Sequence, residues 1–280
     1  MASNLKMAVP HLIKAIVPLQ ARQALRRMAV RARIRGKPFP FSVSPPQSET
    51  ALDCVVAYNR YGAYCVPVSG LRSFAALHVL AGDVWEAATI DFITAHYHGG
   101  DIVHAGAFFG DFLPALALAS GPGNKVWAFE PHPESYRCAQ ITIDLNQLAN
   151  IELVNAGLGE QPGTGELVTH DRRGAGLGGT STMSPLGSDT LQAEGKRSKA
   201  VRIVTIDGAV PEHRRISMIH LDVEGYEERA LAGALRTIHR CRPILLVETA
   251  PSNAWVSEYL RPLGYRVSET VLGNTVLRSS

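Results

Sequence analysis

The stretch Asp101-Ile102-Val103-His104-Ala105-Gly106-Ala107-Phe108-Phe109-Gly110 decides the fold of this chain. It predicts a short apolar strand over 101–105, a glycine-bounded turn over 106–110 and a helix over 111–120. Glycines let a backbone turn tightly and approach a bound molecule closely. The helix that follows presents unpaired N–H groups and the positive end of its dipole at the same place. The stretch therefore predicts a ligand site at the C-terminal end of a strand.

Strands and helices alternate after this stretch. Strands are expected at 125–130, 151–154, 217–222 and 243–248, and helices at 133–146, 226–239 and 253–260. Such alternation is typical of a parallel sheet covered by helices on both faces. Glu130 ends the second strand, twenty residues after Gly110. An acid there can accept hydrogen bonds from both hydroxyls of a ribose, so the pattern indicates an α/β nucleoside-binding domain.

The spacing of the glycines distinguishes between nucleoside cofactors. Gly106 and Gly110 are separated by three residues, and no glycine stands two residues before Gly106. The dinucleotide fingerprint Gly-x-Gly-x-x-Gly and the phosphate loop ending in Gly-Lys-Ser/Thr are therefore both missing at this turn. The looser turn favours S-adenosylmethionine, which has no pyrophosphate, over nicotinamide and flavin dinucleotides. A similar fold without any cofactor is the remaining interpretation.

Several sequence blocks resemble the FkbM family of S-adenosylmethionine-dependent methyltransferases. They are the glycine turn within 102–113, Phe129-Glu130-Pro131, Asp144-Leu145-Asn146, Ala156-Gly157-Leu158-Gly159, Thr205-Ile206-Asp207, Leu221-Asp222-Val223-Glu224-Gly225 and Arg242-Pro243-Ile244. The match runs from Trp85-Glu86 to Glu248, over half of the chain. The resemblance implies a class I methyltransferase fold, Rossmann-like α/β with a mostly parallel seven-stranded sheet. It also implies O-methylation of a hydroxyl or carboxyl group on a small-molecule, sugar or peptide-derived metabolite.

The glycine turn and its neighbours supply the candidate cofactor-binding residues. They are His104, Ala105, Gly106, Ala107, Phe108, Gly110, Asp111, Glu130, Pro131 and Asp222. His104 departs from the family pattern, which usually has Asp at this position. A positive charge on His104 would oppose the ammonium group of the cofactor, whereas a neutral imidazole can still hydrogen-bond there. The alternative is a histidine that only packs at the end of its strand.

Two strand ends supply the candidate catalytic groups. The first and fourth strands of this fold are neighbours, so we expect His104 and Asp222 to face each other at the cofactor crevice. Such a pair would act as general base on an acceptor hydroxyl. Alternatively, Asp222, Glu224 and Glu248 would hold a divalent metal ion, although no metal is predicted. The candidate substrate contacts are Glu224, Glu248 and His170, and the structural alternative for Asp222 and Glu224 is capping of the next helix.

Charge is unevenly distributed along the chain. Residues 1–40 carry nine Lys or Arg and no Asp or Glu, whereas the remaining residues carry 19 basic and 25 acidic side chains. We therefore expect a basic arm over 1–40, a hairpin and helix extension over 41–98, and the S-adenosylmethionine-binding domain over 99–280. A glycine-rich insertion at 160–200 is expected to overhang the site. We expect the arm either to contact an anionic membrane surface or an acidic partner, or to pack on the body as a helix with a solvated basic face. The acidic body argues against nucleic acid as a partner.

Other features of the composition limit the classes of function. Cys54, Cys65, Cys138 and Cys241 match no zinc-binding spacing and are expected to be reduced thiols of a cytoplasmic protein. No apolar stretch approaches the ~18 residues of a membrane span, which argues against a polytopic membrane protein. Two alternatives to O-methylation stay open, namely N-methylation and a membrane-associated binding protein with a degenerate nucleoside pocket. The acceptor and the oligomeric state are not determined by the sequence.

Overall fold

The computed structural model of the protein describes residues 52–170, 181–185 and 197–280. The chain divides into two units, residues 1–47 and 48–280, and every described residue belongs to the second unit. The predicted basic arm over 1–40 therefore lies outside the described residues. Within the described part of the chain, no helix combines the length and the apolar character needed to cross a bilayer.

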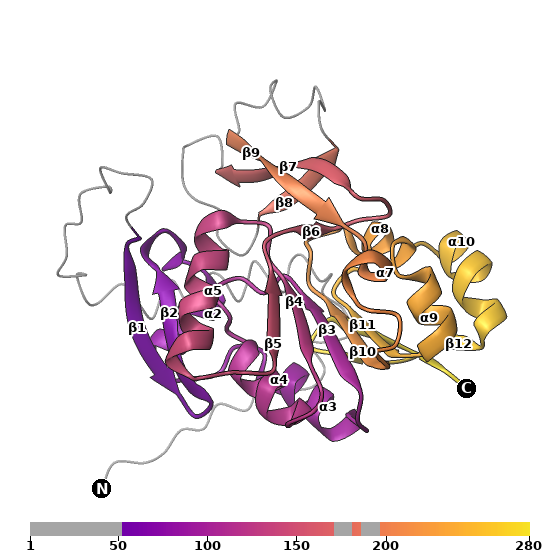
Figure 1. Ribbon diagram of the computed structural model, residues 1–280, viewed down its shortest axis with the longest axis horizontal. Coiled ribbons are helices and arrows are strands. Elements are labelled where there is room, and N and C mark those ends of the chain that lie inside the picture. The colour runs from indigo at the N-terminus through magenta and orange to yellow at the C-terminus, as the bar shows by residue number, and fades with distance from the viewer. Residues whose placement is uncertain (1–51, 171–180, 186–196) are drawn as a thin grey trace, which may run out of the picture. The chain divides into compact units, whose positions relative to one another are not determined.

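A seven-stranded sheet forms the centre of the second unit, in the order β12-β13-β11-β10-β3-β4-β5 (Figure 1). Six strands point the same way, and β13 alone runs antiparallel to its two neighbours β11 and β12. The bounds are β3 Asp101–Ala105, β4 Val126–Phe129, β5 Ile151–Val154, β10 Ile216–Leu221, β11 Ile244–Val247, β12 Tyr265–Val271 and β13 Asn274–Ser279. The predicted mostly parallel α/β sheet is confirmed.

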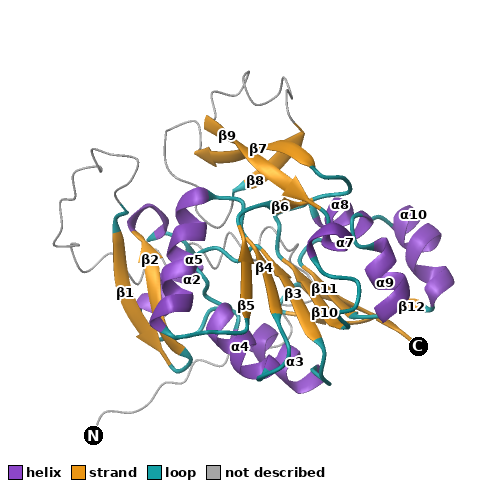
Figure 2. Ribbon diagram, viewed as in Figure 1, coloured by secondary structure: helices purple, strands orange, loops and turns teal. Residues whose placement is uncertain are grey.

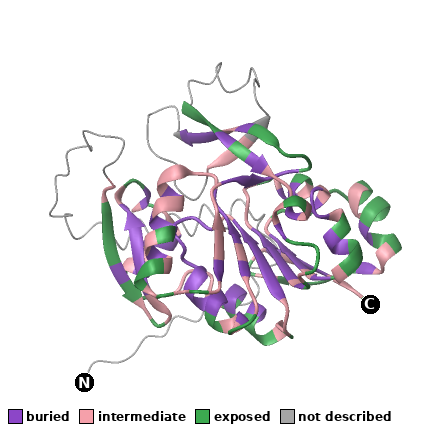
Figure 3. Ribbon diagram, viewed as in Figure 1, coloured by how far each residue is buried: buried purple, intermediate pink, exposed green. Residues whose placement is uncertain are grey.

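Helices cover both faces of this sheet, which is why its central strands are continuous apolar runs (Figures 2 and 3). Val103 and Ala105 of β3 pack in the cluster that contains α8 and α9, whereas Ile102 packs in the cluster with α3 and α4. The helices are α3 Ala87–His96, α4 Leu113–Ser120, α5 Pro133–Leu145, α7 Ile206–Ala209, α8 Glu227–Ala232 and α9 Leu235–Cys241. After β11 come α10 Asn253–Trp255, the π-helix η4 Val256–Leu260 and the 3-10 turn η5 Arg261–Leu263.

One predicted helix is broken in the structure. The sequence predicts a single helix over 226–239, but α8 and α9 are separated at Gly233. A Cβ at Gly233 would lie 2.0 Å from the carbonyl oxygen of Gly159, so the chain after β6 passes directly against this point. This tertiary contact ends the first helix. The hydrophobic periodicity of the sequence gives no indication of it.

The N-terminal extension packs on α5. The predicted hairpin is confirmed as β1 Cys54–Asn59 paired with β2 Gly62–Pro67, followed by the 3-10 turn η2 Val68–Gly70 and helix α2 Phe74–Leu80. Asn146 joins the hairpin to the end of α5, because its Oδ1 accepts from the Ala63 N–H at 2.9 Å and its Nδ2 donates to the Ala63 carbonyl at 2.6 Å. The extension therefore shares a core with the domain that carries the glycine turn.

The predicted glycine-rich insertion forms most of a second sheet, in the order β6-β9-β7-β8. Its strands are β6 Gly157–Leu158, β7 Gly163–His170, β8 Thr182–Pro185 and β9 Arg197–Val204. Strand β7 pairs antiparallel with both β8 and β9. Residues 171–180 and 186–196 of the insertion lie outside the described residues.

Candidate active site

A narrow cleft with a volume of about 40 Å³ lies at the C-terminal ends of β3, β4 and β10. Ligands of open α/β sheets bind at this edge. The large sheet and its turns contribute Ala105, Gly106, Phe108, Phe129, Glu130, Pro131, Asp222, Val223 and Glu224. The second sheet and the segment leading into it contribute Ala156, Gly157, Leu158, Leu167, Ser181 and Met183. The insertion therefore overhangs the cleft, as predicted.

Gly106 lies where the ends of β3 and β10 approach each other closely. Its φ is +85°, and a Cβ there would lie 1.9 Å from the carbonyl oxygen of Asp222. The N–H of Asp222 donates to the Ala105 carbonyl at 3.1 Å, and the N–H groups of Gly106 and Ala107 both donate to the Phe129 carbonyl at 3.1 Å. No other residue fits this position without displacing backbone.

Glu130 ends β4 with its carboxylate on the cleft. Its Oε2 accepts from the Phe108 N–H and its Oε1 from the His132 N–H, both at 2.7 Å. Burial raises the pKa of Glu130 to about 8, although these two backbone hydrogen bonds favour the charged form. Each oxygen of a carboxylate can accept a second hydrogen bond. Glu130 is thus held by the turn over 106–110, hereafter the cofactor turn, with acceptor capacity left for a ligand.

Six of the predicted cofactor-binding residues line the cleft and four do not. Those on the cleft are Ala105, Gly106, Phe108, Glu130, Pro131 and Asp222. Ala107 is fully buried in the core, and Gly110 lies against Thr142 and Leu113. Asp111 is buried at the start of α4, where burial raises its pKa to about 7. Ala107 and Gly110 thus anchor the cofactor turn in the core, and Asp111 follows it, but none of the three forms the cleft wall.

The predicted pairing of His104 with Asp222 is not formed. Side chains alternate across a strand, and Ala105 faces the cleft, so His104 faces the opposite side of the sheet. There its Nδ1 lies 3.0 Å from the Nδ1 of His220, and its ring stacks on Phe112 with centroids 5.3 Å apart. Burial, and then the neighbouring His220, hold the pKa of His104 well below its usual range. His104 is therefore a buried neutral residue and does not touch the cleft.

Asp222 pairs with another carboxyl group instead. It lies just beyond the end of β10, so strand alternation does not fix its direction, and its side chain hydrogen-bonds with that of Glu248 at the end of β11. Burial, and then the charge of Glu248, raise the pKa of Asp222 well above its usual range. One ligand oxygen from each of Asp222, Glu224 and Glu248 lies within 4.8 Å of the others. The structure thus brings together the three acids that were predicted as alternative metal ligands.

The expected helix capping by Asp222 or Glu224 is not formed: the N-cap residue of α8 is Tyr226, without a side-chain cap, and Glu227 at the first helical position binds the loop before the helix. Glu227 Oε1 accepts from the N–H groups of Val223 at 3.2 Å and Gly225 at 3.4 Å, which leaves Asp222 and Glu224 at the cleft. For the predicted substrate contact His170, only the backbone belongs to the described part of the chain; it pairs with Arg197 at the end of β7.

Four residues near the site were missed in the sequence. His220 faces His104 across β3 and β10, and the two histidines stand at equivalent positions, one residue before the strand end. Glu86 is close enough to Asp222 for its charge to raise the pKa of that group. Leu167 and Met183 line the cleft from the insertion, where no sequence pattern indicates them.

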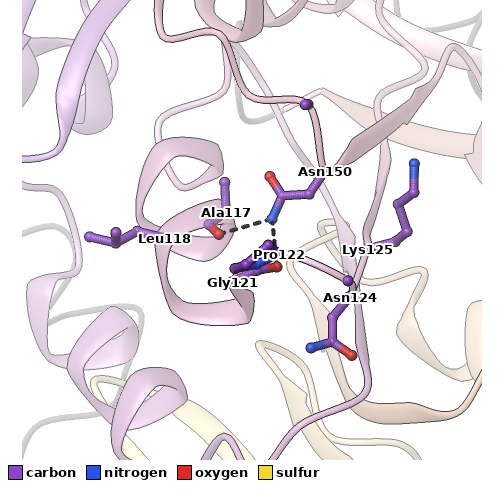
Figure 4. Close-up of a pocket in the computed structure, with 9 residues that line it drawn as sticks. Ala117, Leu118, Gly121, Pro122, Asn124, Lys125 and Asn150 are labelled. Atoms are coloured by element: carbon purple, nitrogen blue, oxygen red, sulfur yellow. Dashed lines mark hydrogen bonds between the residues drawn. The ribbon is translucent and has the colours of Figure 1, made fainter.

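A larger hollow of about 470 Å³ lies at the opposite edge of the sheet (Figure 4). It is formed by the end of α4, the loop over 121–125 and residues 149–150. Asn150 Nδ2 donates to the Ala117 carbonyl at 2.9 Å, and Lys125 pairs with Glu152 at 2.5 Å. These polar groups already have structural partners, and the hollow lies at the N-terminal ends of the strands. We therefore place the active site at the Glu130 cleft.

The comparison with known families agrees with this placement. The family model described as the Methyltransferase FkbM domain matches residues 104–267, which include the cofactor turn, Glu130, Asp222 and Glu248. The chain belongs to the FkbM methyltransferase family. Together with the observed sheet order, this membership confirms the predicted class I methyltransferase fold.

Solved structures of several methyltransferases are similar to this FkbM chain. Methyltransferase FkbM from Methylobacillus flagellatus KT is 21% identical over 65% of this chain and 44% of its own, with a TM-score of 0.44. This chain thus spans less than half of that protein's length. The tRNA (uracil-54, C5)-methyltransferase of Pyrococcus abyssi, solved with S-adenosyl-L-homocysteine, is 13% identical over 84% of this chain and 48% of its own, with a TM-score of 0.39. A putative rRNA-methylase from Clostridium thermocellum is 12% identical over 69% and 94%, with a TM-score of 0.40. A search of the curated proteins finds no match.

Proposed function

We propose that this FkbM protein transfers the methyl group of S-adenosylmethionine to a hydroxyl or carboxyl group of a small-molecule, sugar or peptide-derived acceptor. One observation carries the proposal: the buried carboxylate of Glu130 lies on the cleft beside Gly106 and is held there by the backbone of the cofactor turn. An acid at the end of this strand is the group that accepts hydrogen bonds from ribose hydroxyls.

The residues around the cleft fit the parts of the cofactor. Glu130 suits the ribose, and the apolar Pro131, Leu158 and Met183 suit a flat base. The cleft volume of about 40 Å³ has room for about one water molecule, so we expect side chains that line it, such as the flexible Met183, to turn away when the cofactor binds. Once bound, the cofactor supplies an electrophilic methyl group on a sulfonium. The chain then has to align the acceptor and take up its proton.

Asp222 and Glu248 are the groups that support proton removal. Asp222 and Glu248 are half-buried and hydrogen-bonded to each other, and one proton shared between them avoids two like charges at close range, in line with the raised pKa of Asp222. Asp222 in its ionised form, which becomes populated as the pH rises through its raised pKa, can accept the proton of an acceptor hydroxyl as the methyl group is transferred. Asp222 lines the cleft, whereas Glu248 acts through Asp222. We therefore propose Asp222 as the general base in place of the predicted histidine–carboxylate pair.

Binding of a divalent cation is the second candidate role for these carboxyl groups. Asp222, Glu224 and Glu248 supply hard oxygen ligands, which suit Mg²⁺ or Ca²⁺. A cation there would replace the shared proton and lower the pKa of an acceptor oxygen. The two possibilities differ in one readout: methyl transfer through the shared proton survives chelation with EDTA, whereas the cation-assisted reaction does not.

Calorimetry with S-adenosylhomocysteine tests the proposed function. We expect the wild-type protein to bind, Glu130→Gln to weaken the affinity by about 10–100-fold through the lost charged hydrogen bonds, and exposed Glu212→Gln to match the wild type. Transfer of labelled methyl groups to sets of alcohols, carboxylic acids and amines then identifies the acceptor class. Absence of binding at millimolar ligand, or equal affinities in all three proteins, overturns the proposal. Preferred transfer to amines would establish N-methylation instead.

The basic arm over 1–40 carries a separate proposal, namely peripheral contact with an anionic membrane from the cytoplasm. Co-sedimentation of the full chain with anionic and neutral vesicles tests it. Salt-sensitive binding to the anionic vesicles alone supports the contact, and absence of binding overturns it.

A further inference from the structure

Three of the four cysteine thiols lie in series between the N-terminal hairpin and α5. The Cys65 thiol on β2 is within hydrogen-bonding contact of the Cys138 thiol on α5 and of the Cys54 thiol on β1. Cys65 and Cys138 are buried, and Cys54 is exposed. We call these three residues the thiol cluster. The fourth cysteine, Cys241, lies at the end of α9 and contacts Arg214 instead.

Geometry favours one pair within the thiol cluster for a disulfide. In the hairpin, Cys54 pairs with Pro67 and Cys65 with Val56, so the two cysteines are diagonal neighbours. Diagonal positions are about 7–8 Å apart, which is longer than the usual Cα separation of about 4.4–6.8 Å in a disulfide. Cys138 instead faces Cys65 across the interface between α5 and β2. The backbone there is already close, because the Cys65 N–H donates to Thr142 Oγ1 at 3.0 Å, one helical turn from Cys138.

The hydrogen bonds within the thiol cluster favour Cys65 as the nucleophile. The hydrogen bond from Cys138, and then that from Cys54, lower the pKa of the Cys65 thiol to about 6 against the opposing effect of burial. Burial raises the pKa of Cys54 to about 11, and the contact with Cys65 raises that of Cys138. A thiolate is the reactive form of cysteine, so reaction begins at Cys65. Cys54, the exposed member of the thiol cluster, contacts Cys65 and connects it to the surface.

The thiol cluster is connected to the cofactor turn through α5. Thr142, which accepts from the Cys65 N–H, donates its hydroxyl to the Phe109 carbonyl at 2.8 Å. Phe108 and Phe109 of the cofactor turn pack in the same apolar cluster as Cys65 and Cys138. A covalent bond between Cys65 and Cys138 would shift β2 against α5 and therefore disturb the turn that holds Glu130.

We propose that Cys65 and Cys138 form an oxidation site that controls cofactor binding, with a hydroperoxide as the oxidant. The Cys65 thiolate attacks a peroxide oxygen; the O–O bond breaks, and a sulfenic acid forms with release of hydroxide or an alkoxide, which takes a proton from water. The Cys138 sulfur then attacks that of Cys65, forming the S–S bond, and the departing hydroxide takes the Cys138 proton as water. Two electrons pass from the thiols to the peroxide. The coupling to cofactor binding rests on the proposed function, whereas the oxidation chemistry does not.

Peptide mapping of the full chain tests the oxidation site directly. After treatment with hydrogen peroxide, we expect two of the four thiols to be lost and a Cys65 peptide to be linked to a Cys138 peptide in non-reducing mass spectrometry. Dithiothreitol should release the link. A Cys138→Ser protein should form no such link, and Cys241→Ser, the matched control, should form it as the wild type does. Oxidation of Cys54 or Cys241 without the Cys65–Cys138 link overturns the proposal, and this result needs no variant.

Calorimetry on the oxidised protein tests the coupling. We expect the affinity for S-adenosylhomocysteine to fall at least fivefold in oxidised wild type and to recover after reduction, with no change in peroxide-treated Cys138→Ser. A linked protein with unchanged affinity overturns control by oxidation. If reduced wild type binds no S-adenosylhomocysteine, the proposed function fails, and the linked peptides still decide the oxidation site separately.

Discussion

His104 and His220 share a hydrogen bond between their Nδ1 atoms, 3.0 Å apart, on the adjacent strands β3 and β10. A neutral imidazole carries one N–H, so one ring donates from Nδ1, and the other accepts there and keeps its proton on Nε2. Both Nε2 atoms are buried and have no hydrogen-bond partner within the described residues. Both imidazole rings are therefore neutral in the folded protein, and adding a proton to either of them costs free energy.

This arrangement predicts loss of stability in mild acid. Burial lowers the pKa of His220 from 6.5 to about 4, and that of His104 is lowered as well. Below pH 6.5 the unfolded chain therefore binds protons that the folded protein does not, and the free energy of unfolding falls as the pH drops toward 4. The loss from His220 alone is roughly 3 kcal/mol. Urea unfolding at pH 7.5, 5.5 and 4.5 measures it.

The double variant His104→Phe/His220→Phe is the control for that measurement. Its unfolding free energy should depend less steeply on pH over the same interval, because the remaining acids and histidines are unchanged. Equal slopes in the two proteins would show that the pair titrates normally.

Two glycine substitutions at the cleft should differ sharply. Gly106→Ala places a Cβ 1.9 Å from the Asp222 carbonyl oxygen at a φ of +85°, and backbone cannot move aside cheaply. We expect a loss of about 3–5 kcal/mol of stability and no cofactor binding. Gly157→Ala places its Cβ 2.2 Å from the sulfur of Met183, a flexible side chain that can turn away, so about 1 kcal/mol is expected. Thermal unfolding of both variants tests the contrast; similar losses would contradict it.

The central strands were predictable because burial on both faces of the sheet leaves a simple pattern in the sequence, namely short runs of mostly apolar residues. β3 and β5 have the predicted bounds, and β4, β10 and β11 differ from prediction by one residue at each end. Glu130 was found for the same reason, since a polar residue that follows an apolar run marks a strand end. The break at Gly233 was missed because it depends on the passing Gly159 carbonyl, which lies far away in sequence.

The partners of the site residues were less predictable than their positions. The sequence places His104 near the end of a strand, but a shift of one residue moves a side chain to the other face. Ala105 faces the cleft, whereas His104 faces the other side of the sheet and contacts His220. Asp222 and Glu248 meet because β10 and β11 are adjacent and end together, whereas Met183 reaches the cleft from a separate sheet that local patterns do not place.

Cofactor affinity should increase with pH. Burial raises the pKa of Glu130 to about 8, and the ribose hydroxyls donate to the ionised carboxylate. Between pH 6.5 and 8 the affinity for S-adenosylhomocysteine should rise by up to about tenfold per pH unit and then level off. Glu130→Gln should remove this dependence, so that only the pH dependence caused by titration of the ligand remains. Calorimetry across this range measures both proteins, and parallel pH profiles would refute the role of Glu130.

Substitutions of Asp222 and of Glu248 should have different effects on kcat and on its pH dependence. Asp222→Asn removes the proposed base and should lower kcat by about 10²–10⁴-fold with little change in affinity for S-adenosylhomocysteine. Glu248→Gln keeps the base but removes the neighbouring charge that raises the pKa of Asp222. Asp222 then ionises at lower pH, so the acidic limb of the kcat profile should shift toward acid. Full activity in Asp222→Asn, or an unshifted limb in Glu248→Gln, would exclude the shared proton, and loss of all activity in EDTA would assign the carboxyl groups to a cation.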